Sequence, residues 1–343
     1  TNAEQISHRR SPKRQTMKLL FRVLALCAFC ALLMNTARAQ TPDETLVQAD
    51  KAWDEKSYAR ALELYRAAQK SGKLADADEV KFRIAVSLGE TQKWDEAIAA
   101  GEKLLQETRW KARVLYWLGR LYTKVPHNGW KLDGKIIRGD DYPKTDSAEK
   151  PQRVYLREED QKQTLEYFEK AKIAAPQERD LAMRARFTTP PHPLSHEVEI
   201  DLNFDLAAFI PQVEYSAFIE RLDTAFKEKK ELEAAVKNHL PYDPAWPLPT
   251  RVLYLYNNIL QLDQSKDKHD SALALLAKGM FVRAYRQRMD NWARWYDPEL
   301  KKQITRRYPF DYLEAAPIWR EVIEKYPQDE IAPQTQIAIA QTL

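Results

Sequence analysis

Apolar residues repeat in the same pattern in two neighbouring stretches of this sequence. Between Thr45 and Ser71 they recur at helical spacing in two short segments, which meet near Lys56 and Ser57. Three positions of the second segment fall in register with a later copy: Tyr58 with Trp94, Ala61 with Ala97, and Tyr65 with Gly101. A helical hairpin cannot bury its apolar face alone, so self-similarity at a period of about 34 residues predicts stacked hairpins.

Further units follow the same plan along the chain. A third unit opens at 115–122, and its second helix is predicted only from Thr164 onward, after a long insertion. A fourth unit includes 312–327, and the apolar segment 332–343 would open a fifth. Three less regular segments also show helical spacing and are interpreted as degenerate repeats: 213–239, 250–262 and 269–295.

The order of small and aromatic residues in these units resembles that of the tetratricopeptide repeat (TPR) family. Five residues of the first unit match the family's order: Ala49, Tyr58, Ala61, Tyr65 and Ala68. Four residues of the last full unit also match: Ala315, Trp319, Val322 and Pro327. The resemblance covers about half of the chain after residue 39, and Gly101 departs from it by replacing an aromatic residue. It implies an all-α, TPR-like α-solenoid, with an ordinary helical bundle as the alternative.

Two segments carry the pattern of β-strands. Residues 130–138 resemble a hairpin around Asp133-Gly134, a dipeptide that favours the positive φ angles of a two-residue turn. Between Val198 and Leu206, apolar residues alternate strictly with polar ones, as in a half-buried strand. Because an isolated hairpin is marginally stable, we expect this strand to join the hairpin in a small three-stranded element on the helices.

These features divide the chain into seven stretches. They are an upstream segment with a signal peptide (1–39), TPR-like repeats (40–126), an insertion with a β-hairpin (127–160), a helix completing the third unit (161–187), a Pro-rich break with a β-strand (188–210), degenerate helical repeats (211–310) and a C-terminal TPR-like unit (311–343). The last stretch ends in an uncapped apolar helix, which suggests that the reading frame continues.

The stretch from Met17 to Ala39 has the features of a cleavable export signal. Lys18 and Arg22 precede an apolar run from Val23 to Met34, and small residues follow at Ala37 and Ala39. This run is shorter than the roughly 20 residues that a membrane-spanning helix needs, which argues against a membrane anchor. We therefore expect a periplasmic or secreted protein without a transmembrane segment after cleavage.

Charge and cysteine content exclude several classes of function. Residues 1–39 hold seven of the 54 basic and one of the 50 acidic side chains, which leaves 47 and 49 in the remainder. Such a balance gives no electrostatic reason to expect nucleic acid as a partner. Both cysteines, Cys27 and Cys30, lie in the signal, so the exported part has no thiol chemistry and no cysteine metal site.

No motif indicates catalysis, and we expect neither an enzyme nor a cofactor. His192 and His196 have the spacing of zinc ligands on a helix, but Pro190, Pro191 and Pro193 argue against a helix there. The acidic row at 199–205 lacks the glycine-bearing turn of a calcium loop, so it is expected to be the solvated face of the predicted strand. No metal ligand is predicted.

The resemblance implies a groove lined by the first helix of each hairpin. Helix faces place six residues in this groove: Arg83, Ser87, Glu90, Tyr116, Arg120 and Tyr122. Basic and aromatic residues between 283 and 308 form a second candidate surface, which would contact an anionic polymer or an acidic partner. Four arginines represent it: Arg286, Arg294, Arg306 and Arg307.

The leading hypothesis is an exported scaffold for protein–protein interaction in the cell envelope. One alternative is the non-catalytic N-terminal region of a larger exported protein. Its layout resembles that of bacterial relatives of alpha-2-macroglobulin or that of lytic transglycosylases. The other alternative is a glycan-binding envelope protein, which nine Trp and sixteen Tyr residues would permit. The partner's identity and the oligomeric state stay open.

Overall fold

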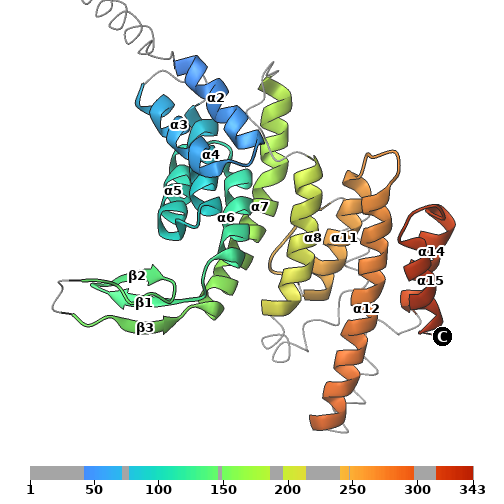
Figure 1. The fold of residues 1–343 in the computed structure, drawn as a ribbon. Helices are drawn as coiled ribbons and strands as arrows, with labels where there is room; N and C mark the ends of the chain where they lie inside the picture. The colour runs from blue at the N-terminus through green and yellow to red at the C-terminus, as the bar shows by residue number, and fades with distance from the viewer. Residues whose placement is uncertain are drawn as a thin grey trace, which may run out of the picture. The chain divides into compact units, whose positions relative to one another are not determined.

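The computed structural model describes residues 42–71, 77–145, 149–185, 196–213, 240–246, 248–296 and 314–342. In these ranges it contains eleven α-helices, which pack in consecutive pairs, and one small antiparallel sheet (Figure 1). The predicted all-α, solenoid-like fold class with an inserted three-stranded element is confirmed. Contacts divide the chain into two compact units, Thr1–Leu74 and Ala75–Leu343, which are described separately below.

The first unit consists of the helical pair α2 (Pro42–Asp54) and α3 (Tyr58–Lys70). Its interface is built from small side chains and one aromatic residue, all buried: Ala49, Ala52, Ala61, Tyr65 and Ala68. Alanines let the two helices approach closely, as the repeat pattern predicts. The connecting turn has Lys56 at φ 58°, and the N–H of Ser57 donates to the Ala52 carbonyl over 2.8 Å.

The second unit opens with α4 (Ala77–Glu90), α5 (Trp94–Glu107) and α6 (Lys111–Lys124). Helices α4 and α6 are both 14 residues long and begin 34 positions apart, which confirms the predicted repeat period. The turn between α4 and α5 repeats that of the first unit, with Gln92 at φ 60° and the Lys93 N–H donating to Leu88.

Gly101 explains why α5 departs from the aromatic pattern. A Cβ atom at this position would lie 2.6 Å from the Trp117 ring and 2.7 Å from the Leu118 side chain, both on α6. Such distances are far below van der Waals contact, so a side chain at position 101 would push the helices apart. The Trp117 ring fills the space that the expected aromatic residue would have taken.

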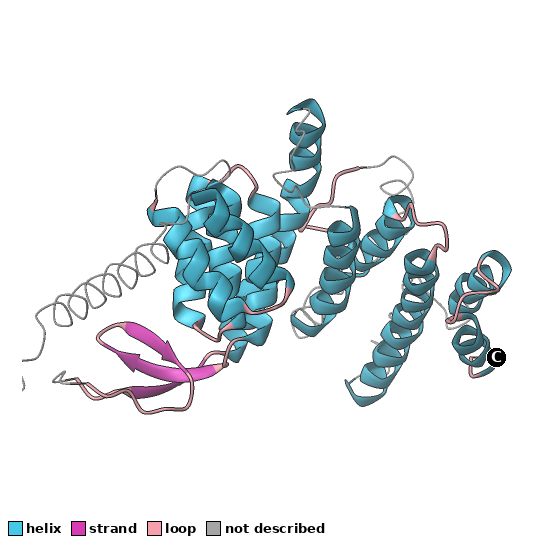
Figure 2. Ribbon diagram, turned by 45° about the horizontal axis from the view of Figure 1, so that its top comes forward, coloured by secondary structure: helices cyan, strands magenta, loops and turns pink. Residues whose placement is uncertain are grey.

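The inserted sheet lies between α6 and α7 in the sequence and has the strand order β2-β1-β3, with both pairings antiparallel. Its strands are β1 (Asn128–Leu132), β2 (Lys135–Arg138) and β3 (Gln152–Tyr155). The predicted hairpin is confirmed: Asp133 and Gly134 form the turn with φ angles of 48° and 74°. Figure 2 shows the sheet projecting from one end of the α6–α7 pair.

Helix α7 (Arg157–Ala185) follows the sheet and packs along α6, which completes the third predicted hairpin. It begins four residues before the predicted boundary at 161. Pro176 lies inside this helix.

Helix α8 (His196–Val213) occupies the segment where a strand was predicted, so that prediction was wrong, and the third strand of the sheet is β3. The alternating pattern suggested a strand although the segment is a helix. Helix α8 packs against both α7 and α11, so apolar residues are buried on more than one of its sides. Leu202, Leu206 and Ile210, spaced four residues apart, form its buried stripe.

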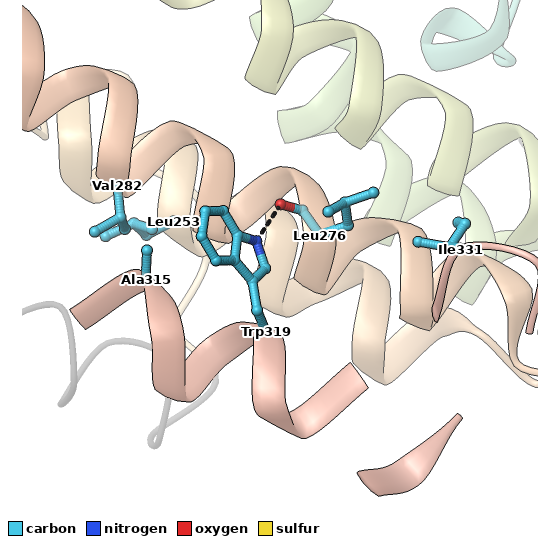
Figure 3. Close-up of a cluster of buried hydrophobic side chains, with 6 residues drawn as sticks. All are labelled: Leu253, Leu276, Val282, Ala315, Trp319 and Ile331. Carbon is cyan, nitrogen blue, oxygen red and sulfur yellow. Dashed lines mark hydrogen bonds between the residues drawn. The ribbon is translucent and has the colours of Figure 1, made fainter. Parts of the chain in front are cut away.

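The C-terminal part contains α11 (Leu248–Leu262), α12 (His269–Tyr296), α14 (Ala315–Lys325) and α15 (Ala332–Ala340). The helical state predicted for 250–262, 269–295 and the final unit is confirmed, whereas most of 213–239 lies outside the described residues. Trp319 is fully buried and is one of six buried residues in this core, and its indole N–H donates to the Leu276 carbonyl over 3.1 Å (Figure 3). In the part of the chain that the structure covers, no helix is long and apolar enough to cross a membrane.

Candidate functional site

Arg83 and Glu90, two of the predicted groove residues, lie on α4, and each forms an ion pair. Arg83 Nε lies 2.7 Å from Glu79 Oε1, and the other carboxylate oxygen of Glu79 accepts a 2.5 Å bond from Arg113 on α6. Glu90 pairs with Lys124 on α6 at 3.2 Å. Both links between α4 and α6 join residues 34 positions apart, so they occupy equivalent places in successive units.

Glu79 is held in its ionised form by these partners. Burial alone would raise the pKa of Glu79, but the guanidinium groups of Arg113 and Arg83 outweigh burial and keep the pKa below its ordinary value. Arg113 also lies over the Phe82 ring, 4.0 Å from its centroid. This cluster therefore connects α4 to α6 and leaves Arg83 engaged within the protein.

Ser87 does not line a surface. Its side chain is fully buried, and its hydroxyl has no hydrogen-bond partner among the described residues. The prediction that Ser87 contacts a partner was wrong, because α4 is buried on more sides than an amphipathic surface helix. Val80, Phe82 and Ala85 on the same helix are buried as well.

Tyr116 and Arg120 meet a residue that the sequence did not connect to them. The Tyr116 hydroxyl donates a 2.9 Å hydrogen bond to Asp205 Oδ2 on α8, and Arg120 Nε lies 3.8 Å from the same oxygen. The Tyr116 ring is buried, whereas Arg120 is exposed. Burial and the Asp205 carboxylate both raise the pKa of Tyr116, so its hydroxyl remains a donor at physiological pH.

Tyr122 lies on a different side of α6 from Tyr116 and Arg120. Six residues correspond to a rotation of about 240° along a helix, which turns Tyr122 away from Tyr116. Its ring contacts Tyr167 at a centroid distance of 5.6 Å, and the Arg138 guanidinium lies 5.5 Å from its centroid. Burial and then Glu102 raise the pKa of Tyr122 to about 12. The predicted groove residues therefore do not form one continuous surface.

The structure describes no side chain of the four arginines that were predicted to contact an anionic partner. Arg286 and Arg294 belong to α12, but their side chains are outside the described residues. Arg306 and Arg307 lie outside the described ranges altogether.

An acidic face on α8 was missed by the sequence analysis. Glu197, Asp201 and Asp205 are spaced four residues apart and share one side of the helix, while Glu199 and Asn203 are buried on another. Asp270, in the first turn of α12, acts on Asp201 electrostatically. These four carboxylates are called the acidic face below. If 196–213 had been interpreted as a helix, the sequence would have predicted this face, because Glu197, Asp201 and Asp205 are spaced four residues apart.

Among the described residues, the acidic face gathers four carboxylates, while Arg120 acts on Asp201 and His269 acts on Asp270 with opposing charge. Burial raises the pKa of Asp201, and the carboxylates of Asp205, Asp270 and Glu197 raise it further, while Arg120 partly opposes them. Burial also raises the pKa of Asp270. The described residues hold no group of three His, Cys, Asp or Glu side chains that could bind a metal ion.

An open depression of about 680 Å³ lies between the loops that precede α12 and α15. Across it, His269 Nδ1 lies 3.0 Å from Asp329 Oδ2. Asp263 accepts the N–H of Ser271 in the first turn of α12 over 3.0 Å, and Asp329 accepts the N–H of Ile331 over 2.9 Å. Carboxylates of the chain itself thus satisfy the starts of both helices, which is a structural role.

A second polar cluster ties the sheet to the helices. Both oxygens of Asp160 on α7 accept bonds from the Arg138 guanidinium, at 2.7 and 2.8 Å, and His127 Nδ1 lies 2.9 Å from one of them. Asp160 and Arg138 are almost completely buried. This bidentate pair anchors β2 on α7 and defines where the sheet leaves the helical array.

No protein-family model matches this sequence. A search of the curated proteins finds no match either. What this chain does must therefore be inferred from its own residues and their geometry.

Proposed function

We propose that this chain is an exported, TPR-like scaffold that binds a protein or peptide partner in the cell envelope. The acidic face takes part in the contact, and the bound segment carries basic side chains. The hydrogen bond from Tyr116 to Asp205 carries the proposal, because it joins the first helices of two successive pairs and places the carboxylates of α8 beside them.

The helical repeat supports a scaffold. Helices α4 and α6 repeat at 34 residues and are linked by ion pairs at equivalent positions, so successive units present equivalent first helices. Arrays of this kind bind partners along the surfaces of stacked units. The order of small and aromatic residues in the TPR-like units and the signal at 17–39 support the TPR-like and exported parts of the proposal.

The electrostatics support a basic partner. Like charges in the acidic face disfavour full ionisation, and a Lys or Arg side chain of a partner would relieve this repulsion. Because the carboxylates of Glu197 and Asp201 are exposed, binding should weaken with salt as the Debye length falls from about 10 Å at 0.1 M to about 3 Å at 1 M.

The test is affinity capture from the exported fraction of the source organism with the wild-type chain and the double variant Glu197→Gln/Asp201→Asn. This variant removes two charges but leaves the bond between Tyr116 and Asp205 in place. We expect recovery of a specific partner to fall at least about tenfold, which corresponds to about 1.4 kcal/mol.

The matched control is Asp54→Asn/Glu63→Gln, which removes two exposed carboxylates from α2 and α3. It should leave recovery unchanged. Equal recovery with both double variants, or recovery that does not respond to salt, would show that the acidic face is not the binding surface.

A further inference from the structure

The inserted sheet has two outer edges, and the hydrogen-bond register shows which groups face outward from each. The N–H of Leu156 donates to the His127 carbonyl over 2.8 Å, next to the paired residues Asn128 and Tyr155. Hydrogen-bonded and non-hydrogen-bonded pairs alternate along an antiparallel ladder. The main-chain N–H and C=O groups of Arg153 and Tyr155 therefore point away from β1, toward the outer edge of β3.

At the opposite edge, formed by β2, one outward-facing main-chain group is already occupied. By the same alternation, the outward-facing residues of β2 are Ile136 and Arg138, since the Gly139 N–H donates to the Asn128 carbonyl. The Asp95 carboxylate on α5 accepts the main-chain N–H of Arg138. In Figure 1, β2 lies on the side of the sheet toward α5, and β3 lies on the far side.

The insertion also concentrates exposed apolar side chains. Nine large hydrophobic side chains are exposed in the part of the chain that the structure describes, and four of them belong to this short insertion: Ile136, Ile137, Tyr142 and Tyr155. Tyr155, on the open edge strand, is 80% exposed. Exposed aromatic residues beside open main-chain groups are typical of surfaces that receive another strand.

The charge of the sheet indicates what kind of strand it would receive. Its strands contain four cations and no carboxylate. Arg138 and Arg153 pair with Asp160 and Asp140 from outside the strands. Lys131 and Lys135 are exposed and have no acidic partner among the described residues, so the sheet favours a segment with acidic side chains.

We propose that the outer edge of β3 binds an extended segment of a partner protein, in which acidic residues alternate with β-branched or aromatic ones. The segment adds as a fourth strand and bonds to the outward N–H and C=O groups of Arg153 and Tyr155. Its apolar side chains contact Tyr155, and its carboxylates, on the other face of the sheet, lie toward Lys131 on the adjacent β1. This surface is separate from the acidic face, which favours the opposite charge, so either proposal stands or fails alone.

The test uses a fluorescein-labelled decapeptide of alternating valine and glutamate, with a valine–lysine decapeptide as the charge control. Binding to the full chain is measured by fluorescence anisotropy, and its location by amide hydrogen exchange. We expect the glutamate peptide to bind and to slow exchange at the Arg153 and Tyr155 amides. Exchange at the Val154 amide, which faces β1, should not change.

Two proline variants separate the edges. Tyr155→Pro removes an outward-facing N–H from β3, and Ile136→Pro removes the equivalent group from β2. An edge position tolerates proline without loss of the sheet, which circular dichroism and thermal unfolding check. Tyr155→Pro should weaken binding about tenfold, the effect of losing one main-chain hydrogen bond to a ligand, and Ile136→Pro should not.

A third variant, Tyr155→Thr, keeps the main-chain groups and removes the ring, so it isolates the part played by the side chain. The proposal is overturned if the glutamate peptide does not bind at millimolar concentration, or if Ile136→Pro weakens binding as much as Tyr155→Pro. It is also overturned if the protected amides lie outside β3, or if the lysine peptide protects β3 equally.

Discussion

The hydroxyl of Tyr116 donates to the carboxylate of Asp205 over 2.9 Å, although the two residues are 89 positions apart in the sequence. This bond joins α6 to α8 across the segment that holds α7 and the sheet. Arg120, one turn after Tyr116, lies 3.8 Å from the same oxygen. One carboxylate thus connects two helical pairs and sets the position of the acidic face.

Removing this bond should destabilise the second unit. Tyr116→Phe deletes only the hydroxyl, and we expect the free energy of unfolding to fall by about 1–2 kcal/mol, as for a partly buried bond to a charged acceptor. Urea unfolding followed by circular dichroism measures the change. The control is Tyr58→Phe, whose hydroxyl bonds to no described residue and whose loss should have little effect. Equal effects of the two variants would contradict a role for the bond.

The buried ion pair between Lys172 and Glu199 should be costly to break from one side. Lys172 Nζ lies 3.1 Å from Glu199 and donates to Asn258 over 2.6 Å, so it links α7, α8 and α11. Lys172→Met should reduce the free energy of unfolding by about 3–5 kcal/mol, because it leaves a buried carboxylate beside an apolar side chain.

Urea unfolding measures the effect of Lys172→Met, and two further variants serve as comparisons in the same experiment. Lys172→Met/Glu199→Leu should recover most of the lost stability, since neither charge is then buried. Lys170→Met breaks an exposed pair with Glu166 on the same helix and should cost less than about 1 kcal/mol. If Lys172→Met costs no more than Lys170→Met, the buried pair is not a structural link.

Glu178 should make the stability of the α6–α7 pair depend on pH. One carboxylate oxygen accepts the N–H of Ala112 over 2.5 Å in the first turn of α6, and the other is buried without a partner among the described residues. Burial raises the pKa of Glu178 from its ordinary value of 4.5 to about 7. The unfolded chain therefore releases this proton at lower pH, and stability falls as pH rises through the window from 4.5 to 7.

The expected loss from this carboxyl is on the order of 2 kcal/mol between pH 4.5 and 7.5. Glu178→Gln keeps an accepting oxygen but cannot ionise, so the difference in stability between variant and wild type should change with pH by that amount. Urea unfolding at both pH values measures it, and the difference cancels other titrating groups common to both proteins. A difference independent of pH would show that Glu178 titrates normally.

Gly279 should tolerate no side chain. A Cβ atom there would lie 2.2 Å from Nε1 of Trp319, whose buried ring packs α14 against α12. Gly279→Ala should therefore cost at least about 1–3 kcal/mol through overpacking, and it should loosen α14 and α15. Hydrogen exchange of the amides at 315–340 measures this loosening. Met280→Ala, an exposed change on the same helix, should leave exchange unaltered and serves as the control.

Local patterns in the sequence predicted most of the helical fold and the hairpin, but only part of the site. The paired residues Tyr58 and Trp94 marked the repeat, and Asp133-Gly134 marked the turn, because each depends on interactions within a few residues. The predicted groove was less accurate, because Ser87 is buried and Tyr122 lies on a different side of α6 from Tyr116. Helix periodicity gives one buried face, but it does not show how many neighbours cover the helix.

Neighbouring helices, rather than local pattern, determined the acidic face. Alternation between Val198 and Leu206 suits a strand, yet the segment is helical, because as a helix it buries side chains on more than one side against α7 and α11. The sequence by itself determined the 34-residue hairpins and the two-residue turn. Only the tertiary structure decided that Asp205 meets Tyr116, because a contact between residues so far apart depends on the packing of the elements between them.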